Sequence, residues 1–223
     1  MTDQVSAVDF DGDEAVAEAI AGFDEARSTR AGALRQAGVL AGLGGIAGLL
    51  LPGVARAREG GSKKNDIKIL NYALTLEYLE AAFYAEAVRM GYTGTVGRFA
   101  STVASHEATH VATLRRVLGA KAVKSPRFDF KGTTRKWHSF LTTAKVLEDT
   151  VVAAYQGQAP LIHQNAVLGP AGAILAVEAR HAAWVRDLLY AGKEVKPAPE
   201  AFSTPMSMSQ VLAAVKKTGF IKA

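Results

Sequence analysis

Along residues 66 to 217, apolar side chains recur at the three- and four-residue spacing of amphipathic helices. No stretch shows sustained alternation of apolar and polar residues, so we expect few strands or none. Capping residues, glycines and prolines divide the region into segments of helical length. The predicted helices are 66–90, 96–118, 134–158 and 171–191, with a short one at 207–217. The fold class is therefore predicted to be all-α.

The connections between the predicted helices indicate how they are arranged. Residues 91–94, Gly-Tyr-Thr-Gly, form a short turn, so the first two helices should run antiparallel. Residues 120–132, which include Pro126, form the long connection in the middle of the region. A bundle built from two antiparallel pairs needs one such crossover. We therefore expect a four-helix bundle made of two helix pairs, followed by a short C-terminal helix.

Polar residues repeat between the two predicted helix pairs at a single offset of 71 positions. The offset relates residues of the same type, and it also preserves leucines and an arginine around them. It takes Glu77 to Glu148, Tyr84 to Tyr155, Glu107 to Glu178 and His110 to His181. Such agreement is hard to obtain by chance, so the two pairs should carry equivalent sites.

The spacing of these residues has a chemical meaning. On a helix, residues three apart share a face, so Glu107 and His110 can bind one metal ion together, and Glu178 and His181 another. Seven residues are about two turns, so a glutamate and the tyrosine that follows it also share a face. Four packed helices would bring four carboxylates and two imidazoles together. This is the ligand set of a two-metal carboxylate site.

With this motif the sequence resembles the ferritin-like superfamily, which includes ferritins, bacterioferritins, rubrerythrins and manganese catalases. Residues 74–84, LTLEYLEAAFY, are more narrowly similar to bacterial exported ferritin-like domain proteins. The resemblance covers roughly residues 65 to 218. It implies a ferritin-like bundle with a di-iron or di-manganese site, and it does not by itself imply one reaction.

The motif suggests a role for each residue. Glu107 and Glu178 are candidates for bridging carboxylates, Glu77 and Glu148 for terminal ones, and each histidine would give one nitrogen to one metal. Carboxylates with a few imidazoles suit iron first and manganese second, although copper or zinc could occupy the site by raw affinity. Two divalent ions would balance the four carboxylates. Without metal, some of these carboxylates should bind protons.

Other residues near the motif have weaker signals. Tyr84 and Tyr155 are predicted to donate hydrogen bonds to ligating carboxylates, and the alternative is a core aromatic with one satisfied hydroxyl. Glu80 has no counterpart in the repeat, since the offset takes it to Val151. It is interpreted mainly as the partner of a surface base, or otherwise as an acid outside the ligand set. The remaining histidines and the large aromatics are expected at the surface and in the core, respectively: His106, His138 and His163; Trp137, Trp184, Phe83 and Phe140.

The chain divides into an acidic leader with a signal-like apolar segment at 1–57, a linker at 58–65, and the bundle with its tail at 66–218. Residues 36–55 carry no charge and are followed by Ala55-Arg56-Ala57, a small-x-small pattern of signal cleavage. The preceding Ser-Thr-Arg is similar to a degenerate twin-arginine signal. We expect export to the periplasm, the cell envelope or the medium. The alternative is a membrane anchor at residues 36–55.

Composition adds limits on function. There are no cysteines, which excludes disulfides, thiolate nucleophiles and Cys-ligated clusters. Residues 58–223 hold 22 basic and 13 acidic residues, a net charge of +9. Such a surface could associate with an anionic cell envelope. No nucleic-acid motif accompanies it, so nucleic acid is not an expected partner.

These observations predict a di-iron or di-manganese carboxylate protein that reacts with O2 or H2O2, of ferroxidase or peroxide-scavenging type. The alternative is a non-enzymatic, exported protein that binds metal or protects against stress at the envelope. The leader and tail argue against a large storage cage, so a homodimer is the expected assembly if the protein is not a monomer.

Overall fold

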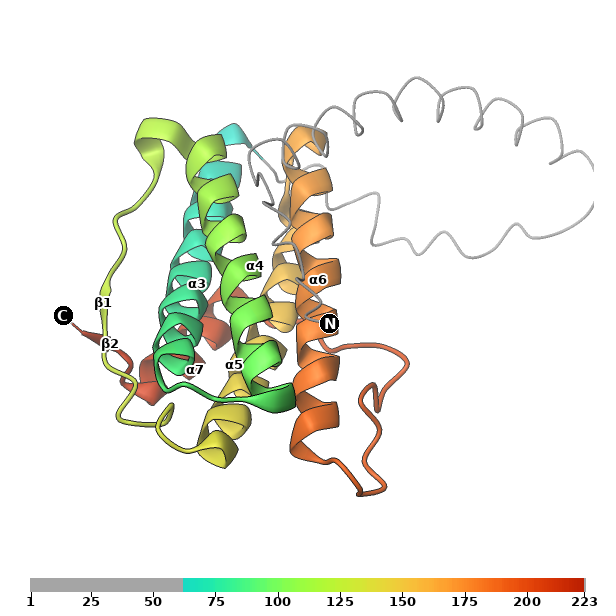
Figure 1. Cartoon of the computed structure of the whole chain (residues 1–223). Coiled ribbons are helices and arrows are strands. Elements are labelled where there is room, and N and C mark those ends of the chain that lie inside the picture. Colours follow the sequence, from blue (N-terminus) through green and yellow to red (C-terminus); the bar gives the residue numbers. More distant parts are fainter. Residues whose placement is uncertain (1–61, 223) are drawn as a thin grey trace, which may run out of the picture. The chain divides into compact units, whose positions relative to one another are not determined.

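A computed structural model describes residues 62–222. Four long helices form this part of the chain (Figure 1). They are α3 (Lys63–Arg89), α4 (Gly94–Leu118), α5 (Trp137–Gln158) and α6 (Asn165–Leu189). Helix α3 packs mainly against α4, and α5 packs mainly against α6. The predicted all-α helical bundle is confirmed. The proposed leader at 1–57 and residues 58–61 of the linker lie outside the described residues.

The start of α3 is fixed by two polar side chains. Ser62 is the N-cap, and its hydroxyl accepts a hydrogen bond from the backbone N–H of Asn65 at 3.2 Å. Asp66, predicted near the cap, lies instead inside the first turn and is fully buried. Its carboxylate accepts the backbone N–H groups of His163 and Gln164 at 2.8 and 2.9 Å. Asp66 therefore ties the beginning of α3 to the loop between α5 and α6.

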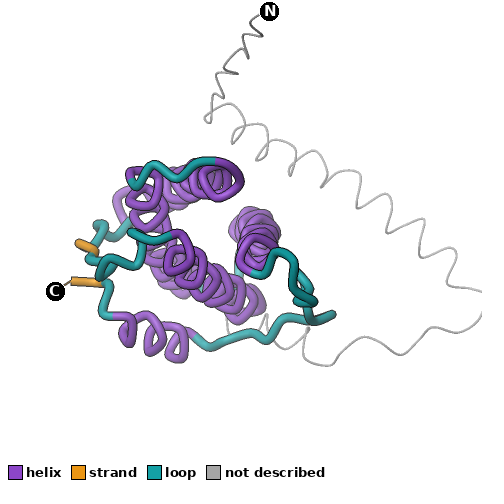
Figure 2. The backbone as a smooth tube through the Cα atoms, turned by 60° about the horizontal axis from the view of Figure 1, so that its bottom comes forward, coloured by secondary structure: helices purple, strands orange, loops and turns teal. Residues whose placement is uncertain are grey.

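The crossover between the helix pairs contains one of the two short strands that residues 62–222 form. After the short helix η1 (Gly119–Lys121), strand β1 (Arg127–Phe128) pairs antiparallel with β2 (Ile221–Lys222) near the C-terminus. Figure 2 shows this small ribbon at one edge of the packed helices. The expectation of few strands agrees with this arrangement.

The C-terminal segment packs back on α5. Helix α7 (Met208–Thr218) begins with a capping box formed by Ser207 and Gln210. Just before it, the backbone N–H of Met206 donates to the carbonyl of Ala153 at 3.0 Å. A Cβ atom at Gly157 would lie 1.9 Å from the carbonyl oxygen of Met206, so only glycine permits this approach. The predicted short helix at 207–217 is thus shifted by one residue and anchored to the second helix pair.

Helix α6 begins earlier than the sequence pattern predicts. It starts at Asn165, after the short helix η2 (Ala159–Leu161), and Pro170 lies inside it. The prediction treated Gly169-Pro170 as the end of a turn. A proline removes one helical hydrogen bond and usually bends or breaks a helix. Here it lies near the N-terminal end of α6, and the helix continues through it.

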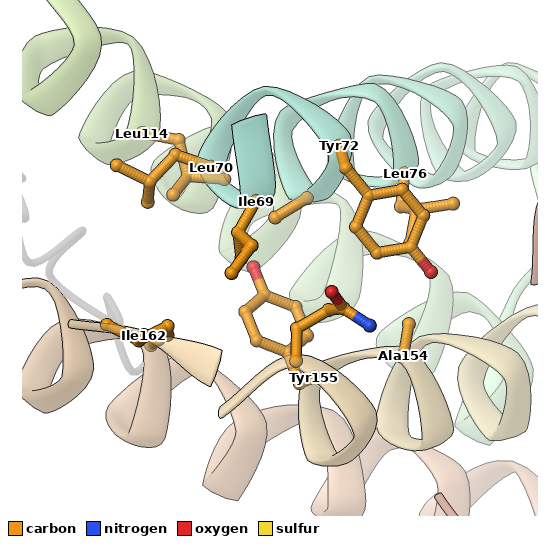
Figure 3. Close-up of a pocket in the computed structure, with 11 residues that line it drawn as sticks. Ile69, Leu70, Tyr72, Leu76, Leu114, Ala154, Tyr155 and Ile162 are labelled. Carbon is orange, nitrogen blue, oxygen red and sulfur yellow. The ribbon is translucent and has the colours of Figure 1, made fainter. Parts of the chain in front are cut away.

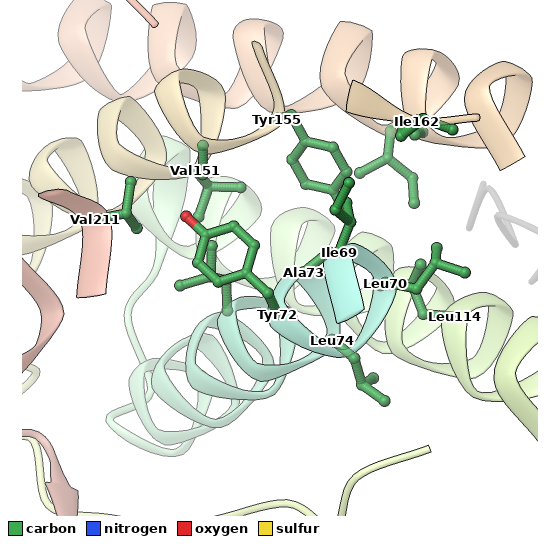
Figure 4. Packing of buried hydrophobic residues seen from close by; sticks show 14 of the residues in the cluster. Ile69, Leu70, Tyr72, Ala73, Leu74, Leu114, Val151, Tyr155, Ile162 and Val211 are labelled. Atoms are coloured by element: carbon green, nitrogen blue, oxygen red, sulfur yellow. The ribbon is translucent and has the colours of Figure 1, made fainter. Parts of the chain in front are cut away.

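The apolar core consists of two clusters, one toward each end of the bundle. The first surrounds Leu76 and includes side chains of α3, α5 and α7 (Figure 4). The second surrounds Leu79 and is rich in aromatic residues, including Phe83, Phe99 and Phe140. Since Leu76 and Leu79 belong to different clusters, the residues between them on α3 lie where the two clusters meet. The predicted motif glutamates occupy this layer.

Trp137 corrects one expectation about the core. It was assigned to the core as a large aromatic residue, but 52% of its surface is exposed. It is the first residue of α5, where the chain has not yet entered the bundle.

Within residues 62–222, no helix combines the length and the apolar character needed to cross a membrane. The possible anchor at 36–55 lies outside that range.

Candidate metal centre

Each of the four long helices contributes to one buried polar cluster. The six predicted ligands are Glu77 from α3, Glu107 and His110 from α4, Glu148 from α5, and Glu178 and His181 from α6. All four glutamates are fully buried, and the two histidines expose no more than 8% of their surface. The structure thus brings together all six residues that the repeat singled out.

The donor atoms of these six residues form two overlapping groups. One group contains Glu77, Glu107, His110 and Glu178, and in each group the donor atoms lie within 4.8 Å of one another. The other group contains Glu107, Glu178, Glu148 and His181. Glu107 and Glu178 belong to both. Each group therefore has the composition of one metal site, and the two sites would share two carboxylates.

The contacts of His110 are too crowded for ordinary hydrogen bonding. Its Nδ1 atom lies 2.9 Å from Glu178 Oε1 and 3.2 Å from oxygens of both Glu77 and Glu107. A ring nitrogen carries at most one hydrogen, so it cannot donate well to three acceptors at once. Three carboxylate oxygens therefore lie close to one nitrogen, as the ligands of a single metal ion lie close to one another.

His181 has an equivalent arrangement in the other group. Its Nδ1 lies 3.2 Å from Glu107 Oε1 and 3.5 Å from oxygens of Glu148 and Glu178. None of these contacts has hydrogen-bond direction, and Nδ1 has no such partner among residues 62–222. Carboxylate oxygens of Glu107, Glu148 and Glu178 are likewise buried without a hydrogen bond in that region. Buried polar atoms are normally satisfied, so these donors fit a pair of bound metal ions.

Without metal, the cluster can hold protons in place of cations. Burial, together with the charge of Glu178, raises the pKa of Glu77 to about 8. Burial also raises the pKa of Glu148 well above its usual range. Burial alone would do the same to Glu107, but its close contacts with His110 and His181 outweigh this effect and lower the pKa of Glu107 to about 2.

The two histidines take the opposite charge. Burial alone would lower the pKa of each imidazole, but the surrounding carboxylates outweigh this effect. They raise the pKa of His181 to about 12, and they raise that of His110 well above its usual range. At neutral pH the metal-free cluster therefore combines imidazolium groups with protonated carboxyl groups. Metal ions would have to displace these protons.

Two tyrosines connect the helix pairs across the cluster. The Tyr84 hydroxyl on α3 donates a short hydrogen bond to Glu148 on α5. The Tyr155 hydroxyl on α5 donates to Glu77 on α3 at 2.6 Å. Burial raises the pKa of both hydroxyls, which therefore remain donors. Each tyrosine fixes the orientation of the glutamate that belongs to the opposite half of the repeat.

Removing these hydroxyls should weaken metal binding while the bundle stays folded. We expect Tyr84→Phe and Tyr155→Phe each to lower metal affinity about 10- to 100-fold, because outer hydrogen bonds to metal ligands have effects of this size. Titration of the metal-free protein with Mn(II) measures the change. Tyr78→Phe is the control, because its hydroxyl donates to the carbonyl of Val123, away from the cluster. Parent-like affinity in both cluster variants would contradict the orienting role.

His106 is a contact of the centre that the sequence pattern missed. It is exposed, as expected, but it was also expected to face away from the ligands because it directly precedes Glu107. Instead, its Nδ1 lies 2.9 Å from Nε2 of His181, and the two rings stack with centroids 5.1 Å apart. His181 thus directs Nδ1 at the carboxylates and Nε2 at His106. An isolated histidine beside a glutamate gives no sequence signal for such a contact between α4 and α6.

Asp149 and Glu80, two acids close to ligands in the sequence, have different surroundings. Asp149 forms ion pairs with Arg186 and Lys145 at the bundle surface, as expected for a residue off the metal face. Glu80 is fully buried, and neither of its carboxylate oxygens has a hydrogen-bond partner among the described residues. The interpretation of Glu80 as the partner of a surface base is therefore wrong, because a fully buried side chain cannot reach such a base.

A small apolar cavity of about 20 Å³ lies beside one end of the cluster. Figure 3 shows Tyr72 and Leu76 of α3 on one side of it, and Ala154 and Tyr155 of α5 on the other. Tyr155 also contacts Glu77 through its hydroxyl, so the cavity adjoins the cluster. A space of this size holds about one water-sized molecule.

The fold and the site together define a class: a helical bundle whose buried carboxylates and histidines can hold a pair of metal ions. The sequence profile described as "Ferritin-like domain" matches residues 65–191, which is more than half of the chain. The chain belongs to this family, and the predicted ferritin-like resemblance is confirmed. A comparison with curated proteins gives no match.

Proposed function

We propose that the protein binds two metal ions, iron in preference to manganese, and uses them to react with O2 or H2O2. The observation that carries this proposal is the pair of overlapping donor groups. Glu107 and Glu178 occur in both, so they would bridge the ions. Glu77 and His110 would complete one site, and Glu148 with His181 the other.

The chemistry of the donors supports this choice of metals. Four carboxylates carry four negative charges, which two divalent ions balance. Carboxylate oxygens with one imidazole per metal suit iron or manganese, whereas a site for zinc or copper would more often contain additional nitrogen or sulfur ligands. Raw affinity would still allow copper or zinc to bind when these metals are abundant.

The side chains around the cluster would prepare it for a small oxidant. A pair of redox-active ions supplies the electrons that reduce O2 or peroxide. Tyr84 and Tyr155 hold the two terminal carboxylates in place, and His106 holds the ring of His181. The apolar clusters on both sides limit the access of water. The cavity next to Tyr155 suits a diatomic molecule better than a large organic substrate.

Two reactions match this description. In the first, Fe(II) is the substrate and O2 or peroxide the oxidant, so that the protein acts as a ferroxidase. In the second, peroxide is removed at a resident pair of metals. The expected export, the homodimer and the contact with an anionic envelope stay predictions in either case.

Stoichiometric addition of Fe(II) tests the function. We expect the metal-free protein to bind two Fe(II) per chain without oxygen. On addition of O2 or H2O2, the iron should be oxidised faster than the same Fe(II) in buffer, with saturation at two iron ions per chain. An oxygen electrode and the absorbance of Fe(III) follow the reaction, and a second run with Mn(II) measures peroxide decay.

The control is the protein with its cluster filled by Zn(II), which has no redox chemistry and should block the reaction. Tight binding of two ions with no acceleration by any tested metal would contradict the oxidant chemistry. It would support the alternative, a non-enzymatic protein in which the metals hold the bundle together.

A further inference from the structure

Glu80 is a buried acid that is not among the six predicted metal ligands. It lies one helical turn beyond Glu77 on α3, and none of its surface is exposed. Both carboxylate oxygens lack a hydrogen-bond partner within residues 62–222. Burial of an unpaired carboxylate costs several kcal/mol. Such a residue calls for a cation that can pair with it.

Packing does not explain the residue. The internal repeat offers a direct comparison, because the offset that takes Glu77 to Glu148 takes Glu80 to Val151. Val151 is buried to the same degree, with 1% of its surface exposed. The same depth of the bundle is therefore filled by an apolar side chain in the other half. A carboxylate at position 80 is not required by the fold.

In the described part of the chain, no basic side chain forms a hydrogen bond or an ion pair with Glu80. Among residues 62–222, the buried polar and charged residues include no lysine and no arginine. The buried histidines, His110 and His181, already face the other carboxylates. The ions proposed for the centre are the remaining source of positive charge near this acid.

Glu80 belongs to one half of the centre more than to the other. Tyr84 lies about one helical turn beyond Glu80 on the same face of α3, and its hydroxyl donates to Glu148. His106, which also lacks a counterpart because the offset takes it to Val177, contacts His181. Two departures from the repeat thus point to the same half of the centre, His106 through its contact with His181 and Glu80 through its position one turn before Tyr84.

We propose that Glu80 is a fifth metal-binding carboxylate of the centre, and that it serves the ion held by Glu148 and His181. This inference rests on the metal binding proposed above. Glu80 lies outside the two compact donor groups, so it joins the ligands of one ion rather than bridging both. The two metal positions are then unequal, with one more carboxylate at the Glu148 side.

The added charge has a further consequence. Five carboxylates exceed the four positive charges of two divalent ions by one. Glu80 therefore strengthens the binding of divalent ions and favours a centre in which one ion is trivalent. Removal of its charge should weaken one binding step and shift the reduction potential of the iron-loaded centre to more positive values.

The test compares Glu80→Gln and Glu80→Val with the parent in anaerobic titrations with Fe(II) and Mn(II). We expect two ions to bind to the parent. In both variants the affinity for one of the two ions should fall about 10-fold or more, as for other groups that support metal ligands. The affinity for the other ion should not change. Because the variants remove a desolvated acid, their metal-free forms should unfold at a temperature no lower than that of the parent. Weaker binding would then not reflect misfolding.

A second pair of variants locates the affected ion. In the His110→Ala background, Glu80→Gln should weaken the one ion that remains. In the His181→Ala background, it should have little additional effect, because residues that serve one ion are not additive. The control is Glu86→Gln on the same helix, whose carboxylate accepts a hydrogen bond from Thr134 outside the cluster.

The outcomes separate the two proposals. If the parent binds two ions and both Glu80 variants bind them with unchanged affinity and unchanged potential, Glu80 is a protonated buried acid and the inference is wrong. If the parent itself binds no metal, the proposed function fails first. A loss that is equal in both histidine backgrounds would contradict the assignment to one ion.

Discussion

Replacement of both Glu107 and Glu178 by alanine is expected to abolish the binding of both metal ions. These two glutamates belong to both donor groups, so each group would lose two of its four residues. One carboxylate and one imidazole would remain for each ion, in a site that also lacks its bridges. Binding should fall from two ions per chain to none at metal concentrations that saturate the parent, as measured by elemental analysis after dialysis.

Two further double variants serve as controls for the double alanine variant. Glu107→Gln with Glu178→Gln keeps the side-chain volume and removes the charge, so it shows whether cavities rather than lost ligands cause the effect. Asp187→Ala with Glu194→Ala removes two exposed acids and leaves the cluster intact. If the Glu107 and Glu178 variants bind as much iron or manganese as the parent, the metals do not occupy this site.

Removal of the metals should make the stability of the protein fall as the pH rises from about 5 to about 8. The pKa of Glu77 rises from 4.5 to about 8 on folding, and those of Glu80 and Glu148 rise well above 4.5, chiefly through burial. Above the unfolded pKa, the folded chain thus binds more protons than the unfolded chain. The free energy of unfolding then decreases with pH.

The other predicted metal ligands do not reverse this trend. The pKa values of His110 and His181 are raised above 6.5, so the stability that they contribute is complete below about pH 6.5 and is lost at higher pH. Glu107 has the opposite sign, because its pKa is lowered to about 2. Its contribution changes below about pH 4.5, outside the range considered, and is fully present above it.

Urea unfolding of the metal-free protein at several values between about pH 5 and pH 8 measures the effect. We expect a loss on the order of a few kcal/mol across this range. The metal-loaded protein should vary less, because bound cations replace the protons that the cluster otherwise needs. A metal-free protein whose stability is constant or increases over the same range would contradict the proposed protonation of the cluster.

The internal repeat explains why so much of the centre could be predicted from the sequence. Helical geometry relates spacing to direction, so Glu107 and His110 must share a face wherever α4 packs. The same holds for Glu178 and His181 on α6. Duplication of the pattern then indicated that both faces point to one place. The bundle, its antiparallel pairs and the six residues of the cluster follow from these local rules.

Properties that depend on neighbouring helices could not be predicted in this way. The sequence places His106 on α4 about 100° from Glu107, but only the packing of α4 beside α6 brings its ring onto His181. Trp137 has the composition of a core residue, yet it is exposed because α5 begins outside the bundle. Periodicity also could not show that α6 would continue through Pro170.

The sequence by itself determined the helical class of this protein and the identity of the six residues that meet at its centre, since both depend on spacing along single helices. The tertiary structure decided which tyrosine supports which glutamate, how His181 is held, and that Glu80 is sealed from water inside the bundle. These features depend on the depth and mutual orientation of four helices. Burial and contacts between distant segments arise only when the helices pack.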